Sequence, residues 1–187
     1  MKKLAILASH NGSGFEAIQN AIANEVLQAS IEVVISNNSD AKVLSRAKKF
    51  GIPSYVTNKS TDINPDEKIA QLLKEYGCTH VFLSGYMKKI SSELTKSFKI
   101  INSHPSLLPA FGGVGMYGRF VHEAVVAANA IESGVTIHEV NENYDEGKII
   151  LQKKLTLTID ETVDSLENKI KSLEKIAIVE ALQKCLN

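Results

Sequence analysis

The sequence has few cysteines, no excess charge of either sign and no long hydrophobic run. Its two cysteines, Cys78 and Cys185, lie far apart and beside no second metal-binding residue, so neither a disulfide framework nor a zinc site is indicated. Lysine and arginine total 21, and so do aspartate and glutamate, which argues against the basic surface of a nucleic-acid binder. No apolar run reaches membrane-spanning length, and residues 4–8 are too few for the core of a signal peptide. We therefore predict a cytoplasmic protein with no nucleic-acid or membrane partner.

Length and composition predict one ordinary globular domain. The 187 residues are 44% hydrophobic and 22% charged, as in most folded chains. This length is enough for a well-buried core, and no repeat, low-complexity segment or interdomain linker interrupts it. We expect a single domain over residues 1–187, with halves at 1–100 and 101–187 that differ in their pattern of elements.

The first half alternates strand-like and helix-like segments. Strands are expected at residues 4–9, 31–36, 54–56, 79–83 and 99–102, and helices at 15–27, 41–50, 64–76 and 91–96. Such alternation predicts an α/β fold, with a mostly parallel, twisted, Rossmann-like sheet and helices on both faces.

The second half has a different pattern. Four glycines within residues 112–118 predict a mobile loop, followed by a helix at 119–128. Strands are expected at 135–140 and 149–157, and the segment between them is too short for a crossover helix, so we predict an antiparallel pair. A last helix is expected at 163–185. Its nearly all-apolar end, 176–182, is predicted to be buried in the core or in a homodimer.

The stretch from Asn102 to Pro105 follows an apolar strand and combines an amide with an imidazole. Side chains two residues apart share a face on extended backbone, so Asn102 and His104 can face one space. Pro105 favours an extended conformation at His104. A hydrogen-bond donor beside a titratable group at a strand's carboxyl end suits acid–base chemistry. The spacing alone leaves open an alternative, a turn cap and a loop histidine.

A glycine turn, Gly12-Ser13-Gly14, lies between the first strand and the first helix. Backbone N–H groups at a helix N-terminus bind anions, and glycine permits close approach. The spacing also fits a loose dinucleotide fingerprint, but residues 36–38 after the second strand include no carboxylate to bind a ribose. We expect a single phosphate at this turn, with a plain tight turn as the alternative.

Asp145 lies in the polar loop between the two late strands. We expect it to pair with His104, raise the pKa of that histidine and orient the imidazole. The alternative is a turn aspartate before a glycine. No pair among His104, His122 and His138 has close metal-ligand spacing, so no metal is expected.

Three motifs together carry a family resemblance. Asn11-Gly12-Ser13, the stretch 102–109 (NSHPSLLP) and Asp145-Glu146-Gly147 stand in the order found in folate-dependent formyltransferases. The sequence resembles that family over essentially its whole length, and its Asn-Gly-Ser turn resembles the glycinamide ribonucleotide branch. The resemblance implies transfer of the formyl group of 10-formyltetrahydrofolate, a co-substrate, to the amine of glycinamide ribonucleotide. This reaction of de novo purine biosynthesis gives formylglycinamide ribonucleotide and tetrahydrofolate, and uses no metal.

The resemblance also implies roles for single positions. Asn102, His104 and Asp145 match the catalytic residues of the family. The matches to its phosphate and ribonucleotide contacts are Gly12, Ser13, Gly14, Lys171, Ser172, Leu173 and Glu174. The matches to its folate contacts are Met87, Lys88, Lys89, Ile90, Asn102, Asn141, Glu142, Asn143, Tyr144 and Asp145. The halves 1–100 and 101–187 would then be phosphate-binding and catalytic, with folate contacts mainly in the second.

The implied mechanism uses two donors to a developing oxyanion. Asn102 and a protonated His104, kept cationic by Asp145, would stabilise that charge, while loop 112–118 closes over the site. Other activities share the motifs. A formyltetrahydrofolate hydrolase or a methionyl-tRNA formyltransferase normally carries a further domain, and a sugar-nucleotide N-formyltransferase suits the Asn-Gly-Ser turn less well. A non-catalytic folate- or nucleotide-binding module would not require all three catalytic positions.

Overall fold

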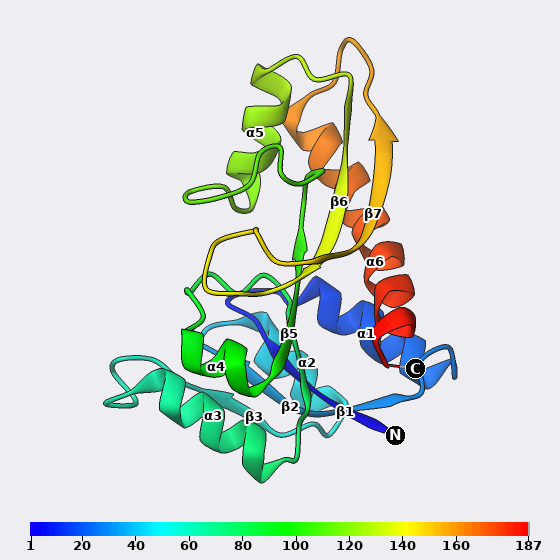
Figure 1. Ribbon diagram of the computed structural model, residues 1–187. Helices are drawn as coiled ribbons and strands as arrows, with labels where there is room; N and C mark the ends of the chain where they lie inside the picture. The colour runs from blue at the N-terminus through cyan, green and yellow to red at the C-terminus, as the bar shows by residue number, and fades with distance from the viewer. Residues whose placement is uncertain (187) are drawn as a thin grey trace. The chain divides into compact units, whose positions relative to one another are not determined.

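Strands and helices alternate through the first half of the chain, as Figure 1 shows by colour along the sequence. A computed structural model describes residues 1–186. The first unit comprises Met1–Ile101 with Leu186, and the second comprises Asn102–Cys185. Strand β5 (Lys99–His104) begins in the first unit and ends in the second. The boundaries of the single domain expected over 1–187 stay a prediction, and residue 187 lies outside the described residues.

The first unit is built on parallel strands. Its strands β1 and β2 pair in parallel, as do β1 and β4, and β2 and β3, giving the order β3-β2-β1-β4-β5. Helices α1, α2 and α3 all contact β2. The strands are β1 Lys2–Leu7, β2 Ala29–Ser36, β3 Ser54–Val56 and β4 His80–Leu83, and the helices are α1 Ser13–Ala23, α2 Lys42–Lys49, α3 Pro65–Glu75 and α4 Ser92–Ser97. The predicted α/β class with a mostly parallel sheet is confirmed.

Burial in the core of the first unit explains why β1 is a continuous apolar run. Residues 4–7 of β1 are all at most 1% exposed, because a central parallel strand is covered on both faces and therefore reads as a continuous apolar run. Phe15 and Ile18 of α1 are fully buried. Helix α1 ends at Ala23, earlier than predicted. Two residues later, Glu25 has a left-handed backbone with φ of 61°. Val26, which lies within the predicted helix at 15–27, is outside α1 and is 47% exposed.

The second unit contains α5 Arg119–Ala127, β6 Glu132–Glu139, β7 Ile149–Thr156 and α6 Val163–Leu186. Strands β6 and β7 are antiparallel, as predicted from the short connection between them. On α6, Ala177, Ile178, Ala181 and Leu182 are buried, but Ile176 is 53% exposed. Most of this segment is therefore buried in the core, as predicted, and burial of Ile176 in a homodimer stays a prediction. Within residues 1–186, no helix combines the length and apolar character needed to cross a bilayer.

Candidate active site

The carboxyl end of β5 places Asn102 and His104 on one side of the strand. Residues 100 and 101 are at most 3% exposed and anchor the strand in the core. The imidazole of His104 is 3% exposed, whereas Asn102 is only half-buried. The strand therefore delivers one buried titratable group and one accessible amide to the same space.

The two nitrogen atoms of His104 have different partners. Nε2 lies 2.9 Å from the carbonyl oxygen of Phe111, and Nδ1 lies 3.5 Å from Oδ2 of Asp145. A carbonyl oxygen only accepts hydrogen bonds, so the proton of the neutral imidazole is assigned to Nε2. Nδ1 then faces the carboxylate and is the atom that gains a proton.

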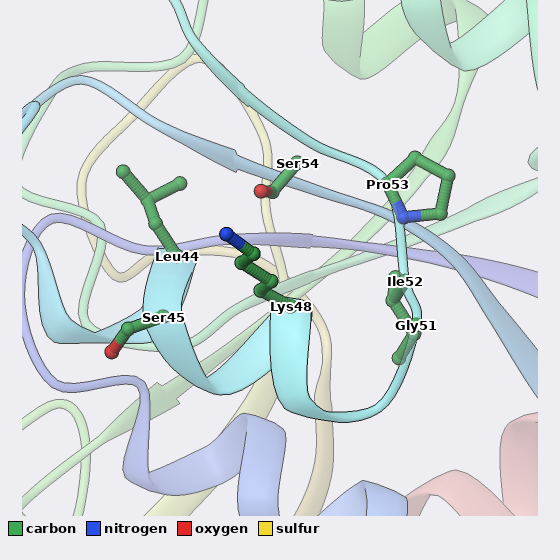
Figure 2. Close-up of a pocket in the computed structure, with 7 residues that line it drawn as sticks. All are labelled: Leu44, Ser45, Lys48, Gly51, Ile52, Pro53 and Ser54. Atoms are coloured by element: carbon green, nitrogen blue, oxygen red, sulfur yellow. The ribbon is translucent and has the colours of Figure 1, made fainter.

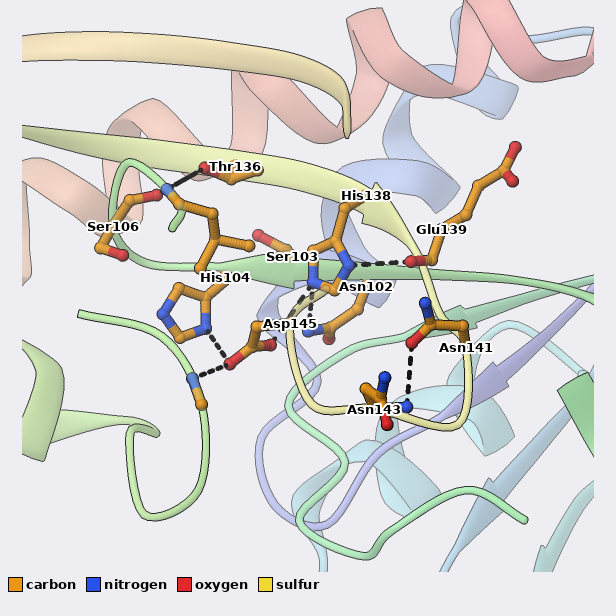
Figure 3. Close-up of polar contacts among 12 residues, drawn as sticks. Asn102, Ser103, His104, Ser106, Thr136, His138, Glu139, Asn141, Asn143 and Asp145 are labelled. Carbon is orange, nitrogen blue, oxygen red and sulfur yellow. Dashed lines mark hydrogen bonds and ion pairs between the residues drawn. The ribbon is translucent and has the colours of Figure 1, made fainter. Parts of the chain in front are cut away.

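Asp145 lies between His104 and His138 (Figure 3). Its backbone is left-handed, with φ of 59°, a conformation that non-glycine residues adopt rarely and mainly where the surrounding structure enforces it. Oδ2 accepts a 2.9 Å hydrogen bond from the Gly113 N–H, and Oδ1 lies 3.6 Å from Nε2 of His138. Burial opposes the ionisation of Asp145, but its contacts with the histidines and with Gly113 outweigh burial and lower its pKa.

The electrostatics of His104 differ from the expectation. Burial lowers the pKa of His104 below its ordinary value, and the Asp145 carboxylate and the Phe111 carbonyl oppose this shift without reversing it. Asp145 raises the pKa of His104, as predicted, but burial lowers it by more, so the net shift favours the neutral imidazole and not the cationic form that was expected.

His138 is a fourth member of the cluster that the sequence did not single out. It lies on β6 and is 2% exposed. Its Nδ1 donates a 2.9 Å hydrogen bond to the Glu139 carbonyl oxygen, which leaves Nε2 to accept the 3.2 Å hydrogen bond from Nδ2 of Asn102. The alternation of side chains along β6 is the one feature of the sequence that indicates the direction of His138, because it predicts that His138 faces the same side as Thr136.

Thr136 fixes the segment that follows His104. Its hydroxyl donates to the Ser106 carbonyl oxygen at 2.7 Å and accepts from the Leu108 N–H at 3.0 Å. Nε2 of Gln152 donates to the Leu108 carbonyl oxygen at 2.9 Å. These hydrogen bonds satisfy buried backbone groups and hold residues 106–108 in one conformation beside the cluster.

The glycine turn lies in the first unit, at the start of α1. Gly12 has φ of 65° and precedes the helix, as the turn requires. The N–H of Phe15, in the first turn of α1, already donates to Oγ of Ser84 at 3.2 Å. An anion at this helix end would therefore contact the N–H groups of Ser13 and Gly14. The assignment of these residues to a phosphate stays a prediction.

The predicted folate and ribonucleotide residues are distributed over both units. Met87 is 41% exposed and its N–H donates to Oγ of Ser9 at 2.7 Å, while Ile90 is 5% exposed. Lys88 and Lys89 between them are exposed. These four residues belong to the first unit.

The remaining predicted binding residues belong to the second unit. In the loop before Asp145, the Asn143 N–H donates to Oδ1 of Asn141 at 2.9 Å, and Tyr144 is 45% exposed. On α6, Lys171 pairs with Glu167, and Glu174 accepts a hydrogen bond from Ser103. The structure thus brings together Asn102, His104 and Asp145. The binding roles of the other positions stay predictions.

Comparison with known proteins assigns the family. A family model described as formyl transferase matches residues 2–182. The chain belongs to the formyl transferase family. Phosphoribosylglycinamide formyltransferase of Bacillus subtilis is 37% identical over 179 residues, covering 93% of this chain and 89% of that protein. A solved structure of phosphoribosylglycinamide formyltransferase from Bacillus halodurans has a TM-score of 0.91 at 33% identity, covering 100% of this chain and 96% of that one.

Not all relatives match this chain in length. The chloroplastic phosphoribosylglycinamide formyltransferase of Arabidopsis thaliana is 37% identical over 188 residues, which are 97% of this chain and 64% of that protein. The chain therefore spans less than two thirds of that relative. The family and the fold are shared over nearly the whole chain in each of these comparisons.

A surface pocket of the chain lies apart in sequence from the predicted site. The pocket has a volume of about 450 Å³ and is lined by residues 44, 45, 48 and 51–54 (Figure 2). Lys48 is its one titratable side chain, and it includes no predicted site residue. Among residues 1–186, no group of three or more His, Cys, Asp or Glu side chains is arranged to hold a metal. The assignment of acid–base chemistry to the His104 cluster stays a prediction.

Replacing His138 tests its role in the cluster of His104, Asp145 and Asn102. His138→Ala removes the acceptor for the Asn102 amide and should lower kcat about 10- to 100-fold, because the amide loses its fixed orientation. Steady-state formyl transfer measures the effect. His80→Ala is the matched control, since His80 is 8% exposed and its Nδ1 contacts Thr79. Equal losses of kcat in both variants would assign His138 a purely structural role.

Replacing Gly12 tests the turn. A Cβ at Gly12 would overlap the side chain of Val43 and require a left-handed alanine, so Gly12→Ala should lower the free energy of unfolding by about 2–4 kcal/mol. Gly51 also has a positive φ, but open space surrounds its Cβ position. Gly51→Ala should therefore show only the backbone cost, about 1–2 kcal/mol. Urea denaturation measures the free energy of unfolding of both variants. Equal losses in Gly12→Ala and Gly51→Ala would show that the side chain of Val43 moves aside.

Proposed function

We propose that this chain transfers the formyl group of 10-formyltetrahydrofolate to the amine of glycinamide ribonucleotide. The observation that supports this most directly is the cluster of Asn102, His104 and Asp145, in which a buried neutral imidazole has its Nδ1 3.5 Å from a carboxylate. The names of the relatives that match nearly the full chain add to this support. The co-substrate would be the folate itself, and the chemistry requires no metal.

The reaction begins with attack of the amine nitrogen on the formyl carbon. The carbonyl oxygen gains negative charge, and the Nδ2–H of Asn102 that is not bonded to His138 donates a hydrogen bond to it. The attacking nitrogen becomes positively charged and must lose a proton. Because His104 is neutral, it can accept that proton as a general base.

Asp145 stabilises the imidazolium that forms in this step. Its carboxylate lies 3.5 Å from Nδ1 of His104, and its own pKa is lowered, so it stays ionised when the proton arrives. The Nδ1–H of the imidazolium then donates to Asp145, while its Nε2–H still donates to the Phe111 carbonyl oxygen. Collapse of the intermediate breaks the bond from the formyl carbon to the folate nitrogen, which takes the proton and leaves as tetrahydrofolate.

The substrate-binding part of the proposal uses the remaining positions. The phosphate would contact Gly12, Ser13 and Gly14, and residues 171–174 would contact the ribonucleotide. The folate would contact residues 87–90, Asn102 and residues 141–145. We also propose that the protein is cytoplasmic and that it forms a homodimer. Sedimentation equilibrium of the full chain tests the homodimer.

One assay tests the proposed activity. The full chain is incubated with 10-formyltetrahydrofolate, with and without glycinamide ribonucleotide, and tetrahydrofolate and formylated product are quantified. We expect tetrahydrofolate and formylated ribonucleotide in equal amounts, and only in the complete mixture. Tetrahydrofolate released equally without the amine would identify a hydrolase, and no turnover in either mixture would overturn the proposal.

A further inference from the structure

The segment that follows β4 is hydrogen-bonded to the end of β1 and to the residues after it. These strands are parallel neighbours, so their carboxyl ends lie at the same edge of the sheet. The Ser84 N–H donates to the Leu7 carbonyl oxygen at 2.8 Å. The Ser9 N–H donates to the Gly85 carbonyl oxygen at 3.1 Å. The chain after β1 continues into the glycine turn predicted to bind phosphate, and the chain after β4 continues into the predicted folate contacts at 87–90.

The hydroxyl of Ser9 joins these two segments through a side chain. Ser9 is 2% exposed, and its Oγ accepts a 2.7 Å hydrogen bond from the Met87 N–H. The same Oγ donates a 2.5 Å hydrogen bond to Oδ1 of Asn37, which follows β2. A hydroxyl has one proton, so its donation to Asn37 directs a lone pair of Oγ toward Met87. The three groups form a chain of hydrogen bonds in which each bond strengthens the next.

Ser84 links the same segment to the far side of the glycine turn. Its Oγ accepts the Phe15 N–H at 3.2 Å, which leaves the predicted phosphate to the two N–H groups that precede it in α1. Ser9 and Phe15 flank the turn in the sequence, so segment 84–87 contacts the chain on both sides of it. The position of the turn and the position of the Met87 backbone are therefore not independent.

We propose that Ser9 is a positioning residue that couples the two predicted substrate sites, because its hydroxyl holds the Met87 backbone to the strand end that enters the glycine turn. This inference rests on the proposed function and adds that the phosphorylated substrate and the folate bind cooperatively. A phosphate on the turn restrains Ser9 and, through the 2.7 Å hydrogen bond, Met87. Less conformational entropy is then lost when the folate binds. By linkage, the folate must tighten binding of the phosphorylated substrate by the same factor.

Binding of two ligands that do not react together measures the coupling. Tetrahydrofolate and glycinamide ribonucleotide are titrated into the full chain by calorimetry, each alone and each with the other at saturation. In the unmodified chain, we expect each ligand to lower the Kd of the other about 5- to 10-fold. In Ser9→Ala, we expect this factor to fall below about twofold, while the Kd of glycinamide ribonucleotide alone changes less than about threefold. Absence of coupling in the unmodified chain would overturn the inference.

Two further variants separate positioning from a general loss of stability. Asn37→Ala keeps the Ser9 hydroxyl but removes the acceptor that orients it, and it should reduce the coupling in the same direction. Asn37 is only half-buried, so this variant serves if Ser9→Ala does not fold. Tyr55→Phe is the control, because it removes a 2.7 Å hydrogen bond to Tyr76 in the same unit, away from both segments. Equal loss of coupling in Tyr55→Phe would assign Ser9 a purely structural role.

Hydrogen exchange gives a readout that needs neither folate nor turnover. Inorganic phosphate is added as the probe, and it should slow exchange of the Met87 amide severalfold in the unmodified chain but not in Ser9→Ala. Protection of the Ser13 and Gly14 amides without protection of Met87 would overturn the inference and leave the predicted phosphate site standing. Protection of none of these amides would overturn both. Formyl transfer without coupling would overturn the inference alone, so its failure is distinguishable from failure of the proposed activity.

Discussion

His104→Ala should lower kcat about 10³-fold while the KM values for both substrates change little. The variant loses the group that accepts the amine proton, a general-base role that contributes about 10²- to 10⁴-fold in comparable sites. The loss falls on kcat because this role arises only after the substrates are bound. Single-turnover formyl transfer under saturating substrates measures it directly.

Chemical rescue provides the control for His104→Ala. Removal of a buried imidazole leaves a cavity beside Asp145 and the Phe111 carbonyl, and added imidazole fits that cavity. Added imidazole should restore part of the rate in His104→Ala and leave the unmodified chain unchanged. A rate near that of the unmodified chain without imidazole would show that His104 takes no part in the chemistry.

Much of the fold follows from local pattern. The continuous apolar run at residues 4–7 and the short connection between β6 and β7 are properties of single segments, and they predict the parallel core and the antiparallel pair. An error occurs where a local pattern is overridden. Val26 continues the apolar spacing of α1, yet the left-handed residue Glu25 ends the helix before it.

The candidate site shows the same division between local and long-range information. The shared face of Asn102 and His104 follows from the period of a strand, and it required no tertiary structure. The direction in which the pKa of His104 shifts could not be predicted in this way. It depends on the balance between burial and the charge of Asp145, and burial is a property of the folded chain. A charge pair read from sequence predicts the smaller of these two effects.

His138 and Ser103 mark the limit of sequence reasoning. His138 is one inward-facing position of an alternating strand, and nothing local distinguishes a packed histidine from one that holds the Asn102 amide. The contact of Ser103 with Glu174 spans 71 residues and depends on how α6 packs within its unit. Hydrogen bonds of this kind are decided by side-chain direction in the folded state, which the sequence pattern does not specify.

Asp145→Asn should lower kcat about 10²-fold and move the acid limb of the pH profile toward lower pH. The asparagine oxygen can still accept from the Gly113 N–H, so the loop stays in place and only the charge is lost. The carboxylate opposes the effect of burial on His104, and without it the pKa of His104 falls further below its ordinary value. The imidazolium formed during the reaction then loses its stabilising partner, which lowers the rate.

The direction of the pH shift distinguishes this account from a cationic His104. If the neutral imidazole is the active form, activity is lost as the pH falls through the pKa of His104, and a lower pKa extends activity to more acidic pH. If the cationic form were active, activity would be lost as the pH rises, and Asp145→Asn would move that alkaline limb to lower pH instead. The pH dependence of kcat/KM in both chains decides between them. An unchanged profile in Asp145→Asn would mean that the 3.5 Å pair of His104 and Asp145 does not control the titrating group.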